Sequence, residues 1–406
     1  LSEAQAHLSR LEQQTGIKPA LIYAIFTPNP TAATLDEDAS QEFIDLNESS
    51  QDDSDQLELL LVTSSDSVIR IPVVGTQRAD VLRSVRRFRN TLFTENTNAF
   101  SPDMQADHHE WAEQFYQWLI EPLEQELEER EIDTIAFLLD EGLRSLPLAA
   151  LYDGDRYLVE RFSIGLMPSL TLTSMEYVNI NNANVLAMGA STFTQSDQDP
   201  LPATEVETAI ITDTLWDGEA FMNEAFSRFN LQQQRQETPF GIVHLATHAS
   251  FQRSQSEEAY IQLWGEERLR LSEIRQLDWH DPTVELVVLS ACETAVGDAN
   301  TELGFAGFSA LAGVKSTLAS LWTVDDAGTL GLMAEFYQQL STAPIKADAL
   351  RQAQLAMLNG EVSIHNGNLV WSEGNRSLPL EQNFPDEMQL THPSFWAGFT
   401  MIGSPW

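Results

Sequence analysis

The chain has a single cysteine, Cys292, among its 406 residues. One thiol cannot form an internal disulfide, and it excludes every metal site that needs two or more cysteines. Basic residues are also scarce: 22 Lys and Arg, only three of them Lys, stand against 61 Asp and Glu, for a formal net charge of −39. Such a charge repels nucleic acid and anionic lipid and attracts basic peptides, so we expect a peptide or protein partner, with no nucleic acid and no membrane.

Long hydrophobic runs and a leader are missing as well. No apolar run reaches the ~18 residues of a membrane-spanning helix. The chain starts Leu1-Ser2-Glu3-Ala4, without an initiator Met or a secretion signal. We therefore expect a cytoplasmic fragment of a longer protein. With 43% hydrophobic and 20% charged residues, it can bury a substantial core.

Strand and helix patterns alternate along most of the chain, which indicates parallel strands with helices on both faces. We predict an α/β fold of two units, residues 1–175 and 176–406, joined near 167–184. Residues 36–58 hold ten acidic side chains and no basic one, which predicts a solvated loop between strands. Strands are expected at 20–26, 57–63, 68–74, 134–139, 157–166, 185–188, 241–246, 284–289 and 316–324. Helices are expected at 78–92, 110–129, 203–215, 303–313, 328–340 and 346–358.

Two predicted strands of the second unit end in reactive side chains. One apolar run ends in A-T-H-A-S (246–250) and the other in L-S-A-C-E (289–293), so that His248 precedes Cys292 by 44 residues. Parallel strands bring such ends to one edge of the sheet. A neighbouring imidazole converts a thiol to thiolate and can then protonate a departing amine. The residues therefore suggest a Cys–His dyad, with the N–H groups of Ala249 and Cys292 as oxyanion donors; a buried packing role for Cys292 is the alternative.

Several strings together resemble the CHAT-domain family, whose members are caspase-like, separase-related and often follow tetratricopeptide repeats. The resemblance covers nearly the whole chain from about residue 57. It is carried by D-E-G-L-R-S-L-P-L-A-A-L-Y-D-G (140–154), H-L-A-T-H-A-S-F (244–251), V-V-L-S-A-C-E-T-A-V-G-D (287–298), L-G-F-A-G-F-S-A-L-A-G-V-K-S (303–316), S-L-W-T-V-D-D (320–326) and H-P-S-F-W-A-G-F-T-M-I-G-S-P-W (392–406).

The resemblance implies a degenerate caspase-like half followed by a catalytic half. It makes Cys292 the nucleophile and His248 the general base and acid of a cysteine endopeptidase, regulated by helical repeats that precede this region in the full-length protein. One residue departs from the family pattern: many members carry Gly after the catalytic His, where this chain has Ala249. A methyl group there would crowd the oxyanion position if the backbone needed a positive φ.

Asp325 and Asp326 follow the next predicted strand after that of Cys292. An acidic pair does not activate a thiol, because negative charge raises its pKa, so we expect it to hold a substrate cation. In separases, a similar L-W-x-V-x-D string contributes the acid that binds Arg before the scissile bond. That resemblance places the acid at Asp326, with Asp325 assisting, and predicts cleavage after a basic residue. The alternative is that one of the two carboxylates caps the following helix.

Other functions fit less well. His244 and His248 have an H-x-x-x-H spacing that would bind metal on a helix, but the segment is predicted as a strand and lacks the Glu of a zincin. We therefore expect no metal, no cofactor and a structural role for His244. The remaining alternative to an enzyme is a catalytically silent caspase-like scaffold or interaction module.

Overall fold

The computed structural model describes residues 2–28, 52–64, 67–92, 102–193, 198–250, 260–277, 279–290, 312–372, 377–380 and 384–406. Most of the predicted helix at 303–313 and most of the predicted acidic loop lie outside these residues. The first half of the chain contains α1 (Ser2–Thr15), β1 (Pro19–Thr27), β2 (Gln56–Val62), β3 (Ile69–Gln77), α2 (Arg78–Leu92), α3 (Pro102–Leu119), α4 (Glu124–Glu129), β4 (Thr134–Leu139), α5 (Leu158–Arg161) and β5 (Ser163–Leu166).

The second half alternates strands and helices and adds small sheets at its edges. Its elements up to residue 290 include β6 (Val185–Gly189), α6 (Ala203–Ala209), β7 (Gly218–Met222), α7 (Arg228–Glu237), β8 (Ile242–Ala246), β9 (Ala249–Ser250), β10 (Tyr260–Gln262), β11 (Arg268–Arg270), α8 (Leu271–Ile274) and β12 (Leu286–Ser290). They are followed by β13 (Ser316–Ser320), α10 (Asp326–Leu340), α11 (Lys346–Leu358), β14 (Ser363–His365), β15 (Asn368–Val370), β16 (Ser377–Pro379), β17 (Glu387–Gln389), α12 (Pro393–Trp396) and β18 (Phe399–Gly403).

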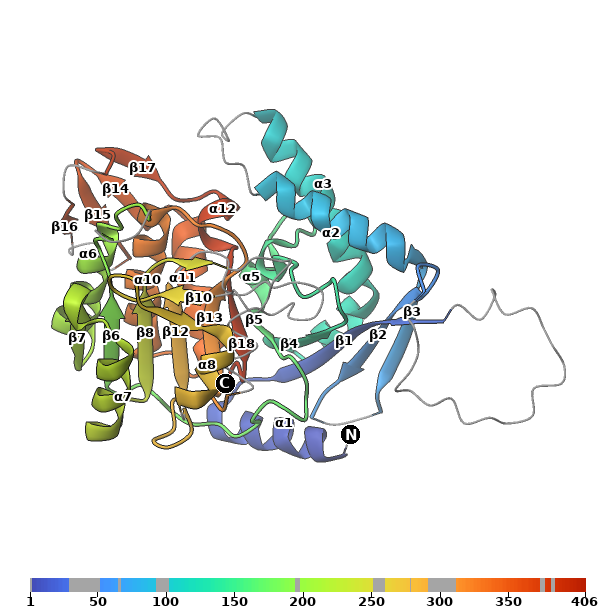
Figure 1. The fold of residues 1–406 in the computed structure, drawn as a ribbon. Coiled ribbons are helices and arrows are strands. Elements are labelled where there is room, and N and C mark those ends of the chain that lie inside the picture. Colours follow the sequence, from blue (N-terminus) through green and yellow to red (C-terminus); the bar gives the residue numbers. More distant parts are fainter. Residues whose placement is uncertain are drawn as a thin grey trace, which may run out of the picture.

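One sheet of 11 strands runs through both halves, in the order β3-β2-β1-β4-β5-β18-β13-β12-β8-β6-β7 (Figure 1). Strands β13, β12, β8, β6 and β7 are parallel, as are β1, β4, β5 and β18. The two sets meet where β18 pairs antiparallel with β13. The predicted α/β class with a mostly parallel sheet is confirmed. The two predicted units share this sheet, and the boundary at residue 175, which stays a prediction, falls between β5 and β6.

The alternation of side chains along the strands builds a core on each face of the sheet. In β1, Ala20 and Ile22 point to one hydrophobic cluster, which includes residues of α2 and α3. Leu21, between them, belongs to the other cluster, with Leu8 of α1 and Trp406. This period of two is the pattern of a strand buried on both faces.

Three predicted elements differ from the structure. The strand expected at 157–166 is split into α5 and β5, because the Tyr157 N–H donates to the Glu160 carboxylate (2.6 Å) and starts a helical turn. The helix expected at 110–129 begins earlier, at 102, and is interrupted before Pro122, which lacks an N–H. The strand expected at 316–324 ends at Ser320, one residue before the N–H of Leu321 makes a last ladder bond to the carbonyl of Gly398 (2.7 Å), the residue that precedes β18.

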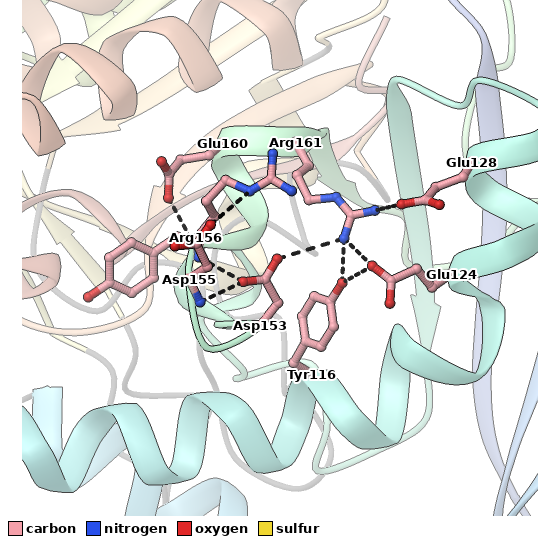
Figure 2. A network of polar contacts seen from close by, with 9 residues as sticks. Tyr116, Glu124, Glu128, Asp153, Asp155, Arg156, Glu160 and Arg161 are labelled. Atoms are coloured by element: carbon pink, nitrogen blue, oxygen red, sulfur yellow. Dashed lines mark hydrogen bonds and ion pairs between the residues drawn. The ribbon is translucent and has the colours of Figure 1, made fainter.

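Arg161 fixes the short helix α5 against α3 and α4 (Figure 2). Its guanidinium, with a side chain only 10% exposed, contacts Glu124, Glu128 (3.2 Å) and Asp153 (3.8 Å). It also donates to the Tyr116 hydroxyl (2.5 Å). Moving α5 away from α3 and α4 would leave the nearly buried Arg161 without its acidic partners. Because an unpaired buried charge is costly, these contacts hold α5 in one position.

The second half of the chain holds α5 from the other side. Arg351 of α11 donates to the carbonyls of Val159 (2.8 Å) and Glu160 (2.7 Å). Arg89 of α2 donates to the carbonyl of Leu321 (2.9 Å), just after β13. Hydrogen bonds and a continuous sheet therefore join the two halves.

We expect residues 180–406 expressed alone to aggregate, because they lack β5 and leave one edge of β18 unpaired and one part of the core uncovered. Co-expression of residues 1–179 should restore a soluble complex, since the contacts between the halves are non-covalent. Size-exclusion chromatography and thermal unfolding of both preparations test this. A soluble 180–406 fragment that unfolds cooperatively would contradict it.

Candidate functional site

His248 lies just beyond the carboxyl end of β8. The register of β8 with β12 sets Ala246 opposite Ser290, and the Thr247 N–H donates to the carbonyl of Ser290 (3.3 Å). Both strands therefore end at the same level of the sheet. Cys292 itself lies outside the described residues, two positions after Ser290.

The imidazole of His248 is oriented by the backbone. Its Nε2 lies 2.7 Å from the carbonyl oxygen of Asp199, and its ring packs against Phe193 with centroids 4.8 Å apart. A carbonyl oxygen only accepts hydrogen bonds, so Nε2 carries a proton. In the neutral ring Nδ1 is then the free base. The sequence could not identify the Asp199 carbonyl as this partner, because every residue has a backbone carbonyl.

Ala249 lies in β9, opposite Ile261 of β10. The N–H of Gln262 donates to the His248 carbonyl (2.9 Å), which makes Ala249 and Ile261 a non-hydrogen-bonded pair. The Ala249 N–H therefore points away from β10. The backbone of Ala249 is extended, a conformation open to any residue, so its methyl group brings no strain of the kind a positive φ would cause.

Asp325 and Asp326 divide between two positions at the start of α10. The Asp325 carboxylate accepts hydrogen bonds from the N–H groups of Ala327 (2.9 Å) and Gly328 (3.0 Å), and so caps the helix. Asp326 instead lines a pocket together with His248. The capping role that the sequence left open between the two carboxylates thus belongs to Asp325.

The pocket beside His248 is narrow and acidic. Its cavity volume is about 30 Å³, and part of it opens to solvent. Its lining side chains include hydroxyl and carboxyl groups, and no Lys or Arg is among the described residues that line it. These are Leu201, Ala203, Thr204, Glu207, Thr247, His248, Ser290, Val324, Asp326 and Thr329. Burial and the charges of Asp325 and Glu207 raise the pKa of the Asp326 carboxyl to about 6.

Glu207 was missed by the sequence analysis, although it interrupts the apolar side of α6 four residues after Ala203. One of its carboxylate oxygens lies 3.1 Å from Nε2 of the fully buried His244, without the alignment of a hydrogen bond. The other ring nitrogen of His244 contacts the Tyr337 hydroxyl (3.2 Å). His244 is therefore a buried structural residue.

The described part of the chain offers neither a metal site nor a membrane-spanning helix. Within the described ranges, no group of three or more His, Cys, Asp or Glu residues is arranged to hold a metal ion. None of the helices that the structure describes combines the length and the apolar composition of a membrane crossing.

Comparison with known structures shows the fold family. A chain of the Saccharomyces cerevisiae separase–securin complex matches with a TM-score of 0.56 and 11% identity, over 99% of this chain and 31% of that chain. This chain thus spans about a third of the length of that relative. The Arg-specific cysteine proteinase gingipain R of Porphyromonas gingivalis matches with a TM-score of 0.42 and 12% identity, over 80% of this chain and 74% of that chain.

Sequence comparison agrees with this fold. No curated protein matches the chain. Residues 109–404 match the family described as the CHAT domain, which is more than half of the chain. The match includes both strand ends, with His248 and Cys292, and the start of α10. The chain therefore belongs to the CHAT domain family and has the caspase-like peptidase fold that separase shares.

Proposed function

We propose that this chain is a cysteine endopeptidase that cleaves protein substrates after a basic residue. The observation that carries the proposal is that His248 and Asp326 line the same pocket. A general base and an acidic side chain in one pocket provide the two things such cleavage requires: a group that activates a nucleophile and a charge that selects the substrate. The single thiol of the chain and its family membership support Cys292 as the nucleophile, and a free thiol suits a reducing cytoplasm.

The proposed chemistry begins at Nδ1 of His248, which accepts the thiol proton of Cys292. The thiolate attacks the carbonyl carbon of the scissile bond, and the N–H groups of Ala249 and Cys292 stabilise the oxyanion. His248 then donates its proton to the departing amine, leaving a thioester. Water, deprotonated by the same imidazole, hydrolyses the thioester and regenerates the thiol. The Asp199 carbonyl keeps the ring oriented throughout.

Asp326 has a separate role in this proposal. A carboxylate near a thiol opposes formation of the thiolate, so it is better explained by substrate binding. Asp326 lies in a pocket lined by Glu207 and without any described Lys or Arg, which leaves its charge uncompensated. A cationic substrate side chain would compensate that charge on binding.

Matched fluorogenic peptides that differ only in the residue before the scissile bond test the proposal. We expect kcat/KM to be far higher for the peptides with Arg or Lys before the scissile bond than for those with Leu or Asp. Preference for Asp would contradict the assigned pocket. Absence of hydrolysis with every peptide would favour the scaffold alternative.

The preference for a basic residue should depend on pH. The pKa of Asp326 is raised to about 6, so the carboxylate is charged above that pH and becomes neutral below it. We therefore expect the ratio of kcat/KM for the Arg peptide to that for the Leu peptide to fall about tenfold per pH unit below pH 6. The ratio cancels the titration of the dyad, which both peptides share. A ratio that stays constant from pH 7.5 to 5 would contradict the role of Asp326.

A further inference from the structure

Glu207 is a second acidic residue in the pocket that holds His248 and Asp326. It comes from α6, whereas Asp326 begins α10, so two different elements each contribute a carboxylate. Glu207 is only 3% exposed. An acidic side chain is rarely buried to this extent without a full set of partners, because its desolvation is costly.

The described partners of Glu207 leave one of its carboxylate oxygens, Oε1, without an aligned hydrogen bond. Its described side-chain contact is His244, at 3.1 Å, and that contact is not aligned as a hydrogen bond. The Tyr337 hydroxyl occupies the other ring nitrogen of His244. The imidazole of His244, held between the Tyr337 hydroxyl and the Glu207 carboxylate, fixes the position of the Glu207 side chain beside the pocket.

The two carboxylates repel each other. The charge of Glu207 contributes, after burial and Asp325, to the raised pKa of Asp326. Among the described lining residues only threonine and serine hydroxyls and the imidazole of His248 offer polar groups besides these acids. Ser290 is 7% exposed, and its hydroxyl has no hydrogen-bond partner among the residues that the structure describes. The pocket therefore contains polar groups without an aligned partner among the described residues, the Oε1 atom of Glu207 and the Ser290 hydroxyl, that a substrate could contact.

We propose that Glu207 is a second specificity-determining residue, which acts with Asp326 to select arginine over lysine before the scissile bond. The inference rests on the proposed endopeptidase function and narrows its substrate class. A guanidinium is planar and presents five N–H donors along its edges, so it can contact two carboxylates from different elements at once. An ammonium group is a compact point charge that pairs well with one of them.

The test compares Glu207→Gln with the unchanged 1–406 chain at pH 7.5, on peptides that carry Arg, Lys or citrulline before the scissile bond. Glutamine keeps the shape of the side chain and removes its charge. We expect the Arg-to-Lys ratio of kcat/KM to fall about tenfold or more. The matched control is Asp213→Asn, which removes an exposed charge from the helical segment that continues α6 and should leave the ratio unchanged.

A purely structural role for Glu207 would lower hydrolysis of all three peptides by the same factor, so the ratio separates the two explanations. Because Glu207 is buried against His244, a second variant, Glu207→Asp, keeps the charge but withdraws it from the pocket. It should lower the same ratio at least about threefold. An unchanged ratio in the folded variants would overturn the inference.

The outcomes also separate this inference from the proposed function. If Glu207→Gln keeps the Arg-to-Lys ratio while Asp326→Asn loses Arg cleavage, the endopeptidase assignment stands and the role of Glu207 is wrong. If the unchanged protein hydrolyses none of the peptides, both are wrong.

Discussion

Replacement of Cys292 with Ala is expected to lower hydrolysis of the Arg peptide by at least about 10⁴-fold, because no other thiol in the chain can form the acyl intermediate. Replacement of His248 with Ala should cost about 10³-fold, since the thiol then lacks its base and the leaving amine its acid. The double variant should be no slower than Cys292→Ala, because the two side chains act in the same steps. Initial rates on one peptide, at enzyme concentrations matched by absorbance, measure all three.

The control for the histidine is His365→Ala. His365 is exposed, pairs with Glu387 (2.9 Å) and belongs to the sheet formed by β14–β17. Its loss should leave the rate unchanged. Hydrolysis that survives in Cys292→Ala, or rates that fall equally in His248→Ala and His365→Ala, would contradict the dyad.

Asp326→Asn and Asp325→Asn are expected to change the stability of the protein in opposite directions, and only Asp326→Asn should change its specificity. Asp326→Asn should lower kcat/KM for the Arg peptide by about 10²-fold, because a substrate cation loses its partner in the pocket. The same change should raise the melting temperature at pH 7. The pKa of the Asp326 carboxyl is raised to about 6 in the folded protein, so its ionised form destabilises the fold. The free energy of unfolding therefore falls as pH rises from the pKa of this carboxyl in the unfolded chain to about 6, and Asn avoids this loss.

Asp325→Asn should act through the helix instead. Asparagine is a good N-cap but a neutral one, so we expect a loss of up to about 1 kcal/mol, mostly from the interaction of the charge with the helix dipole. The ratio of Arg to Leu hydrolysis should stay unchanged. Thermal unfolding and peptide kinetics on both variants give the comparison. A fall in the Arg-to-Leu ratio for Asp325→Asn would assign substrate binding to both carboxylates, and an unchanged Arg rate in Asp326→Asn would refute the pocket.

Periodicity predicts the elements that carry the candidate site because their local signals agree with the tertiary fold. The apolar runs of β8 and β12 are buried on both faces, and α11 spans the predicted residues, Lys346–Leu358. The sequence does not reveal that β18 joins the two halves. An apolar strand has the same sequence pattern whether its neighbours run parallel or antiparallel to it. The insertion of β18 between β5 and β13 therefore depends on packing across the whole chain.

The site shows the same limit. His248 and Cys292 could be predicted because strand ends and family motifs mark them. The Asp199 carbonyl has no sequence signature, since backbone groups are common to all residues. Glu207 had a weak signal, an acid on the apolar side of a helix, but its neighbours His244 and Asp326 come from other elements. Its place in the pocket is decided by the sheet order rather than by local sequence.

The central claim is that Cys292 is an activated nucleophile beside a pocket for a basic side chain, and covalent labelling tests it most directly. An Arg-containing peptide electrophile is incubated with the 1–406 chain, and the adduct is located by mass spectrometry. Because the chain has one cysteine, the site of thiol labelling is unambiguous. We predict one adduct, on Cys292, that is absent in Cys292→Ala, slowed at least about 10²-fold in His248→Ala and lost after denaturation. Absence of labelling, or labelling at the same rate in the folded, denatured and His248→Ala proteins, would contradict the account.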